Sequence, residues 1–195
     1  ERSAQKQESS FMKSDKFRLE HDFLGDREIP SDAYYGIQTL RAIENFNITG
    51  IPVSKEPLLI KSFGYVKKAA AMANRDCGVL TKEETEAIIF GSEKLIDGQY
   101  LDQFITDMIQ GGAGTSCNMN ANEVIANIGL EHMGKQKGEY QFLHPNNHVN
   151  CSQSTNDAYP TAFRIALYKK IDHFIEAMLK VQKAFAEKGV EFAGI

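Results

Sequence analysis

The stretch "AFRIALYKKIDHFIEAMLKVQKAFAEKGVEF", which runs from Ala162 to Phe192, decides the fold class. Its apolar residues recur every three or four positions, which is the spacing of one face of an α-helix. These residues are Phe163, Leu167, Ile171, Phe174, Met178, Val181 and Phe185. About thirty helical residues make a rod of roughly 45 Å. A helix of that length seldom stands alone, so we predict that it packs in a bundle or between subunits.

Shorter helical patterns precede this rod. Pro57 stands where the first residue of a helix tolerates proline, and Gly78 closes the pattern that follows it. The stripe predicted for that helix comprises Leu59, Phe63, Val66, Ala70 and Ala73. Thr81 and Glu84 form a capping-box pattern that opens the next helix, which Gly98 ends. The segment "NEVIANIGLEHMG" is also helical in pattern.

The fold class predicted from these patterns is all-α, since no segment shows a convincing period-two run of apolar residues. A further short helix is expected from about Ser31 to Asn45, with Ser31 as its N-cap. We expect residues 1–16 to be a disordered tail or an expression remnant. Residues 17–157 then form a small N-terminal helical domain. Residues 158–195 begin a central helical bundle whose remainder is absent, with Pro160 at the boundary.

Composition places the chain among ordinary globular proteins. It has 195 residues, of which 42% are hydrophobic and 25% charged, and its formal net charge is −4. This mildly acidic balance argues against a nucleic-acid or membrane-surface partner. The N-terminus lacks the apolar centre of a signal peptide, so a cytoplasmic location is expected. The three cysteines, Cys77, Cys117 and Cys151, fit free thiols better than a disulfide framework or a zinc site.

Two polar stretches stand out, "GGAGTSCNMN" at 111–120 and "HPNNHVNCSQSTND" at 144–157. Both are rich in Ser, Thr and Asn, and both precede a helical pattern. Hydroxyls and amides donate hydrogen bonds without fixed charge, and a helix N-terminus adds oriented N–H groups. Together they predict a cradle for a small anion, most naturally a carboxylate. The alternative is that these residues only cap helices and form turns.

Other candidate sites are weaker. His144 and His148 are four residues apart, but Pro145 lies between them and the sequence places no Glu or Cys ligand beside them. We therefore predict no metal site. Cys117 and Cys151 lie within the polar stretches, yet no histidine is placed by sequence to activate either thiol, so small buried residues are the better interpretation.

At these residues the chain resembles a known family. The segments "GGAGTSCNMNANEVIAN", "HPNNHVNCSQSTNDAYPTAFRIA", "DFLGDREIPSDAYYGIQTLRAIENF" and "KKAAAMAN" resemble the aspartase/fumarase superfamily and occur in the same order. The resemblance covers nearly all of residues 17–195. The forms "GTS" at 114–116, "STND" at 154–157 and "AYYGIQTLRAIENF" resemble the aspartase branch more than the class II fumarase branch.

The resemblance implies a lyase that reversibly eliminates ammonia from L-aspartate to give fumarate through an enediolate. It implies a homotetramer on a central helical bundle, with each active site built by three subunits. No organic cofactor is implied, although a divalent metal can act as an activator. By resemblance the substrate-binding residues are Thr115, Ser116, Ser154, Thr155 and Asn156, of which Ser154 and Thr155 match positions that bind the β-carboxylate.

The chain also departs from the family. Members are more than twice as long, and their catalytic serine base belongs to a segment that would follow residue 195. We therefore expect this chain to hold no catalytic base and to be inactive alone. Cys151 stands where a lysine is usual, and Asn147 where many members have aspartate. Two alternatives remain, a class II fumarate hydratase and a non-catalytic helical assembly module.

Overall fold

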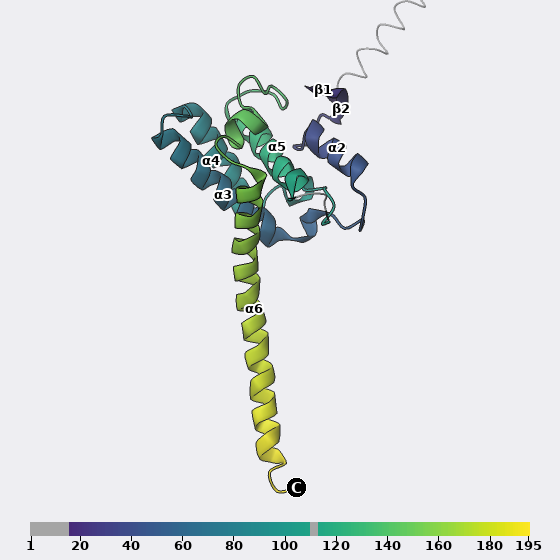
Figure 1. Cartoon of the computed structure of the whole chain (residues 1–195), viewed down its shortest axis with the longest axis vertical. Coiled ribbons are helices and arrows are strands. Elements are labelled where there is room, and N and C mark those ends of the chain that lie inside the picture. The colour runs from purple at the N-terminus through teal and green to yellow at the C-terminus, as the bar shows by residue number, and fades with distance from the viewer. Residues whose placement is uncertain (1–15, 110–112) are drawn as a thin grey trace, which may run out of the picture.

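The computed structural model describes residues 16–109 and 113–195, and within them the chain is mostly helical with one small hairpin (Figure 1). The helices are α2 (Ile37–Asn45), α3 (Pro57–Asp76), α4 (Lys82–Ile96), α5 (Thr115–His132) and α6 (Thr155–Glu191). The hairpin pairs β1 (Phe17–Asp22) with β2 (Gly25–Pro30). Three short turns, η1 (Val53–Lys55), η2 (Leu101–Gln103) and the π-helical η3 (Pro145–Val149), complete the fold.

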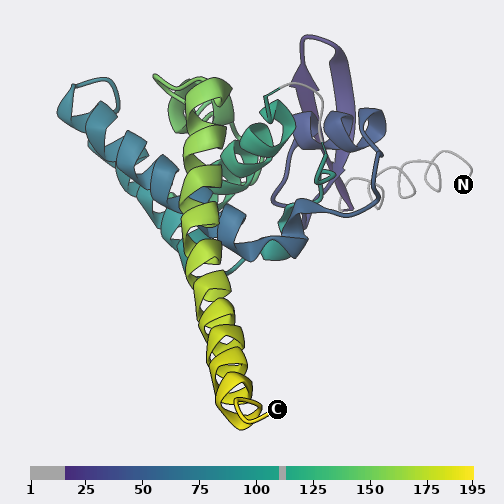
Figure 2. The ribbon, with the colours of Figure 1, turned by 60° about the horizontal axis from the view of Figure 1, so that its bottom comes forward.

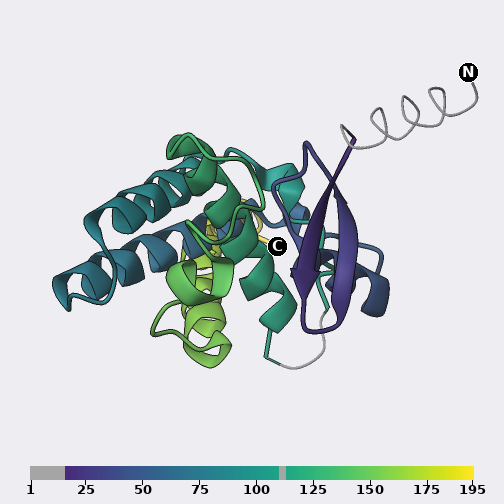
Figure 3. The same cartoon turned by 90° about the horizontal axis from the view of Figure 1, so that it is seen from above.

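Helix α5 forms the centre of the main core, and its residues 117–118 and 120–130 are buried. Seen from above, the hairpin and α2 lie on one side of α5, and α3 and α4 lie on the other (Figure 3). The local signals around α3 and α4 are confirmed. Pro57 begins α3, Gly78 follows its end with a φ of 74°, and Thr81 with Glu84 forms the capping box of α4.

The buried stripe of α3 differs in phase from the predicted one. Leu59 and Phe63 are buried as expected, but Ala73 is exposed and Ala71 is buried instead. The same buried face carries two polar residues, Lys67 and Asn74. Val66 is half-buried and packs against the core, and Ala70 is half-buried, so the predicted stripe was wrong only at Ala73. The small side chain of an alanine carries little information about which face of a helix is inside.

The sequence does not indicate the hairpin because the inward-facing residues of β1 are charged. Residues Phe17 and Leu19 of β1 are 45% and 68% exposed, whereas Glu20 is only 4% exposed. Arg18 also points inward, and it donates hydrogen bonds to the carbonyls of Pro30, Ala33 and Tyr35. The apolar residues of β1 alternate with charged ones only from Phe17 to Glu20, a run too short to identify a strand. That alternation would also place Phe17 and Leu19 on the buried face, which is the wrong one.

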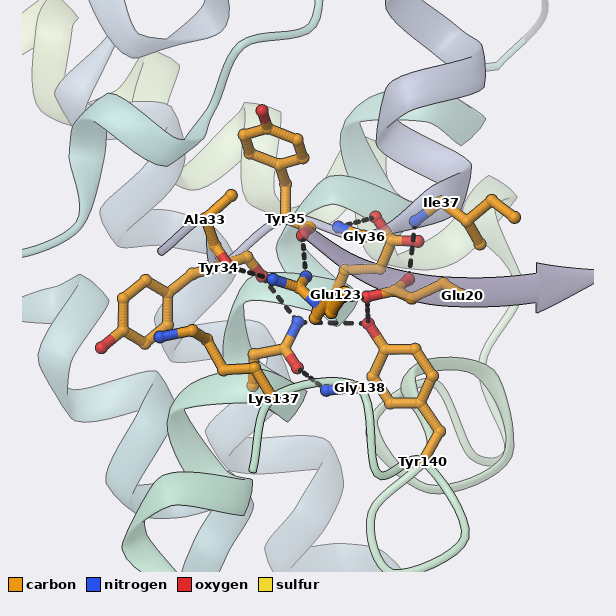
Figure 4. A network of polar contacts seen from close by, with 12 residues as sticks. Glu20, Ala33, Tyr34, Tyr35, Gly36, Ile37, Glu123, Lys137, Gly138 and Tyr140 are labelled. Atoms are coloured by element: carbon orange, nitrogen blue, oxygen red, sulfur yellow. Dashed lines mark hydrogen bonds and ion pairs between the residues drawn. The ribbon is translucent and has the colours of Figure 1, made fainter. Parts of the chain in front are cut away.

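Helix α2 begins at Ile37 and not at Ser31, and its N-cap is Gly36, which has no side chain to cap with. Two buried carboxylates supply the missing acceptors (Figure 4). Glu123 of α5 accepts hydrogen bonds from the backbone N–H groups of Gly36, Gln38 and Thr39, and Glu20 accepts one from Ile37. The prediction of a Ser31 cap was wrong because this helix is capped through tertiary contacts.

The buried position of Glu123 makes the stability of the fold depend on pH. Burial is the main cause that raises the pKa of Glu123 from 4.5 to about 7, and the charge of the nearby Glu20 is the second. The hydrogen bonds that Glu123 accepts lower the pKa and oppose this shift. Between pH 4.5 and 7 the folded chain therefore holds a proton that the unfolded chain has released. We expect this group's contribution to the free energy of unfolding to fall as pH rises through that window.

A Glu123→Gln variant should lose this part of the pH dependence, because a glutamine does not titrate. The measurement is chemical denaturation at several pH values between 4.5, the pKa of Glu123 in the unfolded chain, and about 7, its pKa in the folded chain. Glu83→Gln, at an exposed position in the first turn of α4, is the matched control and should keep the wild-type slope. Equal slopes for Glu123→Gln and the wild type would contradict the assignment.

Helix α6 is a 37-residue rod that projects well beyond the packed body (Figures 1 and 2). It begins at Thr155, so Pro160 lies inside the helix and does not end the preceding loop as predicted. Its first turns bury Ala158, Ala162 and Ala166. The apolar residues of the predicted stripe are confirmed as helical but are exposed: Phe163, Leu167, Ile171, Phe174, Met178, Val181 and Phe185. No described helix is both long and apolar enough to cross a bilayer.

Candidate functional site

The two polar stretches meet in space at the N-termini of α5 and α6. Asn118, in the first turn of α5, donates from Nδ2 to Oγ1 of Thr155 at 3.3 Å. Gly114, the N-cap of α5, lies directly against the ring of Tyr159 in α6, and a Cβ there would come within 2.5 Å of that ring. The N-termini of two helices therefore lie side by side, which brings their N–H groups and positive partial charge close together.

The predicted site residues occupy the first turns of these helices. Thr115 is exposed and Ser116 is half-buried at the start of α5. Thr155 is half-buried and Asn156 is exposed at the start of α6. Gly111 and Gly112 of the first stretch lie outside the described residues. The structure thus brings the described part of the first stretch, residues 113–120, together with the end of the second. The role of these residues as an anion cradle stays a prediction.

Ser154 has a capping role of its own. It is the N-cap of α6, its hydroxyl accepts a hydrogen bond from the N–H of Asn156, and its own N–H donates to Asp157. For Ser154, the alternative interpretation of the polar stretches as caps therefore holds. A serine hydroxyl that accepts from the helix still has its hydrogen to donate, so capping does not prevent Ser154 from binding an anion.

Thr115 lines a pocket of about 480 Å³ between α5, the hairpin and η3. Glu123 and Tyr140 form part of its wall, and burial raises the pKa of Tyr140 well above its ordinary value. His144 also lines it, and burial and then the neighbouring His148 lower the pKa of His144. The other lining residues are His21, Asp22, Phe23, Ile37, Gln38, Met119, Pro145 and Asn146.

Both histidines of the polar loop have structural contacts. His144 Nδ1 accepts hydrogen bonds from the N–H groups of Asn146 and Asn147, and His148 Nδ1 accepts one from the N–H of His144. The fold also brings Glu84 to 3.7 Å from His148 Nε2, which the sequence did not indicate. In the described part of the chain no three His, Cys, Asp or Glu side chains are grouped to hold a metal ion.

A buried lysine behind the two helix N-termini was missed. Lys67 of α3 is 0% exposed, and its Nζ donates to Asn150 Oδ1 at 2.9 Å and to Gln153 Oε1 at 3.0 Å. Burial lowers the pKa of Lys67 to about 7, and the charge of Asp157 opposes that change. Its position four residues after the buried Phe63 was the available signal, because residues four apart share a helix face.

Comparison with known proteins finds a matching family and similar proteins. A family described as "Lyase" matches residues 25–195. The chain is 58% identical over 178 residues to an aspartate ammonia-lyase from Helicobacter pylori J99, and 53% identical over 183 residues to one from Escherichia coli K12. These alignments cover 91% and 93% of this chain but 38% of each relative. The chain thus spans less than two fifths of the length of these relatives.

Solved structures show the same relationship. A crystal structure titled fumarate lyase:delta crystallin, from Brucella melitensis and bound to cobalt, superposes with a TM-score of 0.88 at 51% identity. That match covers 91% of this chain and 38% of the other. A class II fumarase from Schistosoma mansoni gives a TM-score of 0.70 at 34% identity, over 77% of this chain and 31% of the fumarase.

Proposed function

Since the chain belongs to this lyase family and is a homologue of aspartate ammonia-lyases, we propose that it is part of an enzyme that converts L-aspartate reversibly to fumarate and ammonia. The observation that carries the proposal is the contact between Asn118 and Thr155, which joins the two polar stretches. It brings hydroxyl, amide and backbone donors from two helix N-termini close together, an arrangement that suits a small dicarboxylate and supports the proposal.

The chemical difficulty of the reaction is the low acidity of the aspartate Cβ proton. A base removes that proton, its electron pair moves into the β-carboxylate to give an enediolate, and ammonia leaves from Cα as the double bond forms. Donors aimed at the developing dianionic carboxylate lower the barrier. We assign this role to Ser154 and Thr155, and we place Thr115, Ser116 and Asn156 near the rest of the substrate. The base is expected outside the residues of this chain.

We propose further that residues 17–157 act as the N-terminal domain and that residues 158–195 begin a central bundle in a homotetramer. The support is the apolar face of α6 beyond Ala166, which is exposed in this chain. Exposed apolar surface of this extent is usually covered in the working protein.

The test uses the natural full-length product of the gene that encodes this chain. L-aspartate and L-malate are supplied separately, fumarate is followed by ultraviolet absorbance, and ammonia is measured in parallel. Fumarate and ammonia in equal amounts from aspartate is the expected result. Fumarate from malate alone would move the assignment to a fumarase, the second candidate, which the likeness to the Schistosoma mansoni enzyme favours. No product from either substrate would contradict both.

A further inference from the structure

Lys67 is an uncommon residue to find at the centre of a core. It is fully buried on α3, and its hydrogen-bond acceptors within residues 16–109 and 113–195 are two neutral amide oxygens, those of Asn150 and Gln153. Keeping a lysine in such a place is unfavourable unless its donors are well used. The further contacts of the Asn150 and Gln153 amides show what the hydrogen bonds from Lys67 hold in place.

Lys67 and Asn74, seven residues apart on the same face of α3, together hold the turn that leads into α6. Asn74 Nδ2 donates to the carbonyl of Cys151 at 2.8 Å. Gln153 Nε2 donates to the same carbonyl at 3.1 Å, while its oxygen accepts from Lys67. The segment immediately before the N-cap of α6 is therefore built on two side chains of α3.

The hydrogen bonds also have a fixed direction. Lys67 Nζ donates to Asn150 Oδ1, so the amide of Asn150 presents its oxygen to the lysine. Its nitrogen end donates to the carbonyl of Gln153 at 3.1 Å, which agrees with that orientation. Asn118 approaches the same Asn150 oxygen at 3.1 Å and must therefore present its own NH₂ group.

That NH₂ group reaches Thr155. Asn118 Nδ2 lies 3.3 Å from Thr155 Oγ1, so the threonine oxygen accepts from Asn118. The hydroxyl hydrogen of Thr155 is then available to donate elsewhere. An anion-binding hydroxyl needs this polarity, because a hydroxyl that donated its hydrogen to Asn118 would turn its lone pairs toward the ligand.

We propose that Lys67 is a positioning residue that orients the Thr155 hydroxyl as a donor to the substrate carboxylate, acting through Asn150 and Asn118. This inference rests on the proposed function for its substrate. The geometry that the inference requires is given by the hydrogen bonds of Lys67, Asn150 and Asn118 described above. Lys67 does not touch the substrate in this scheme.

The main test is a double-mutant cycle in the natural full-length protein. Lys67→Met is expected to lower kcat/KM for L-aspartate by roughly 10²-fold, the scale of a lost oxyanion donor. In a Thr155→Ala background the same change should have little further effect, because residues that act through one another are not additive. A Lys67→Met effect of equal size in both backgrounds would overturn the proposal.

Asn74→Ala is the matched control. It removes a support of the same turn from the same face of α3, but Asn74 has no part in the path from Asn150 to Thr155. Its effect on kcat/KM should be small and equal in both backgrounds. If Lys67→Met behaves as Asn74→Ala does, Lys67 only stabilises the turn and the inference fails.

If Lys67→Met does not fold, Asn118→Asp tests the polarity at nearly constant size. A carboxylate only accepts hydrogen bonds, so Thr155 would donate to it and lose its donor to the substrate. We expect a loss in kcat/KM comparable to that of Thr155→Ala. Wild-type kcat/KM in a folded Asn118→Asp enzyme would overturn the proposed orientation.

Amide hydrogen exchange separates this inference from the proposed function, because it requires no substrate. Lys67→Met, or Lys67→Gln where the methionine variant is unfolded, should speed exchange in the first turns of both α5 and α6. Asn74→Ala should speed it only near Cys151. An inactive wild-type protein with this exchange pattern would refute the function and keep the positioning role, whereas unchanged exchange in the first turn of α5 would refute that role.

Discussion

Replacing Thr155 by alanine in the natural full-length protein is expected to lower turnover of L-aspartate by roughly 10²–10³-fold, the usual cost of one lost oxyanion donor. The physical reason is the place of its hydroxyl. It lies in the first turn of α6, it accepts a hydrogen bond from Asn118, and its hydrogen remains for an anion. Initial rates of fumarate formation over a range of aspartate concentrations measure the effect.

Two controls accompany this substitution. Thr155→Ser keeps the hydroxyl and should keep most of the turnover. Thr161→Ala removes an exposed threonine from the same helix and should leave the rate unchanged. If the rate of Thr155→Ala is within a factor of about three of the wild-type rate, the loss is far smaller than that of an oxyanion donor. Thr155 would then not belong to the site.

The second large effect is expected at Gly114, where an alanine should destabilise the fold by about 2–5 kcal/mol. A Cβ at this position would come within 2.5 Å of the Tyr159 ring, and overpacking of this kind costs about 1–3 kcal/mol. The backbone φ of 86° adds strain of roughly 1–2 kcal/mol for a residue with a side chain. Since Gly114 separates the two helix N-termini, turnover should fall as well.

Chemical denaturation compares Gly114→Ala with Gly134→Ala. Gly134 has a φ of 71°, but a Cβ there would meet nothing within 4 Å, so this control carries the strain without the overlap. The difference between the two variants isolates the contact with Tyr159. Equal destabilisation of both would show that α5 and α6 are not held this closely at their N-termini.

Much of the helical fold could be predicted from the sequence because its signals are local. The capping box of Thr81 and Glu84 and the glycine after α3 depend only on neighbouring residues, and both are confirmed. The long periodic stretch likewise predicts the rod of α6. The predicted boundary at Pro160 was wrong, because a proline was taken to interrupt the helix. The helix begins earlier, after the N-cap Ser154, and Pro160 lies in its early turns.

The hairpin and the start of α2 could not be predicted, because buried charges decide both. Glu20 and Glu123 come from segments about a hundred residues apart, and each accepts hydrogen bonds at the N-terminus of α2 (Figure 4). A sequence pattern assigns carboxylates to the surface unless their partners are known. Those partners exist only after α5 has packed beside the hairpin.

For the candidate site, the sequence by itself determined the two polar stretches and the residue types suited to an anion. Only the tertiary structure decided that the stretches meet, through Asn118 and Thr155, and that Lys67 stands behind them. The physical reason is that hydroxyls and amides are identified by residue type, whereas the direction of their hydrogen bonds is set by partners distant in the chain. Lys67 on α3 is such a partner, 83 residues before Asn150.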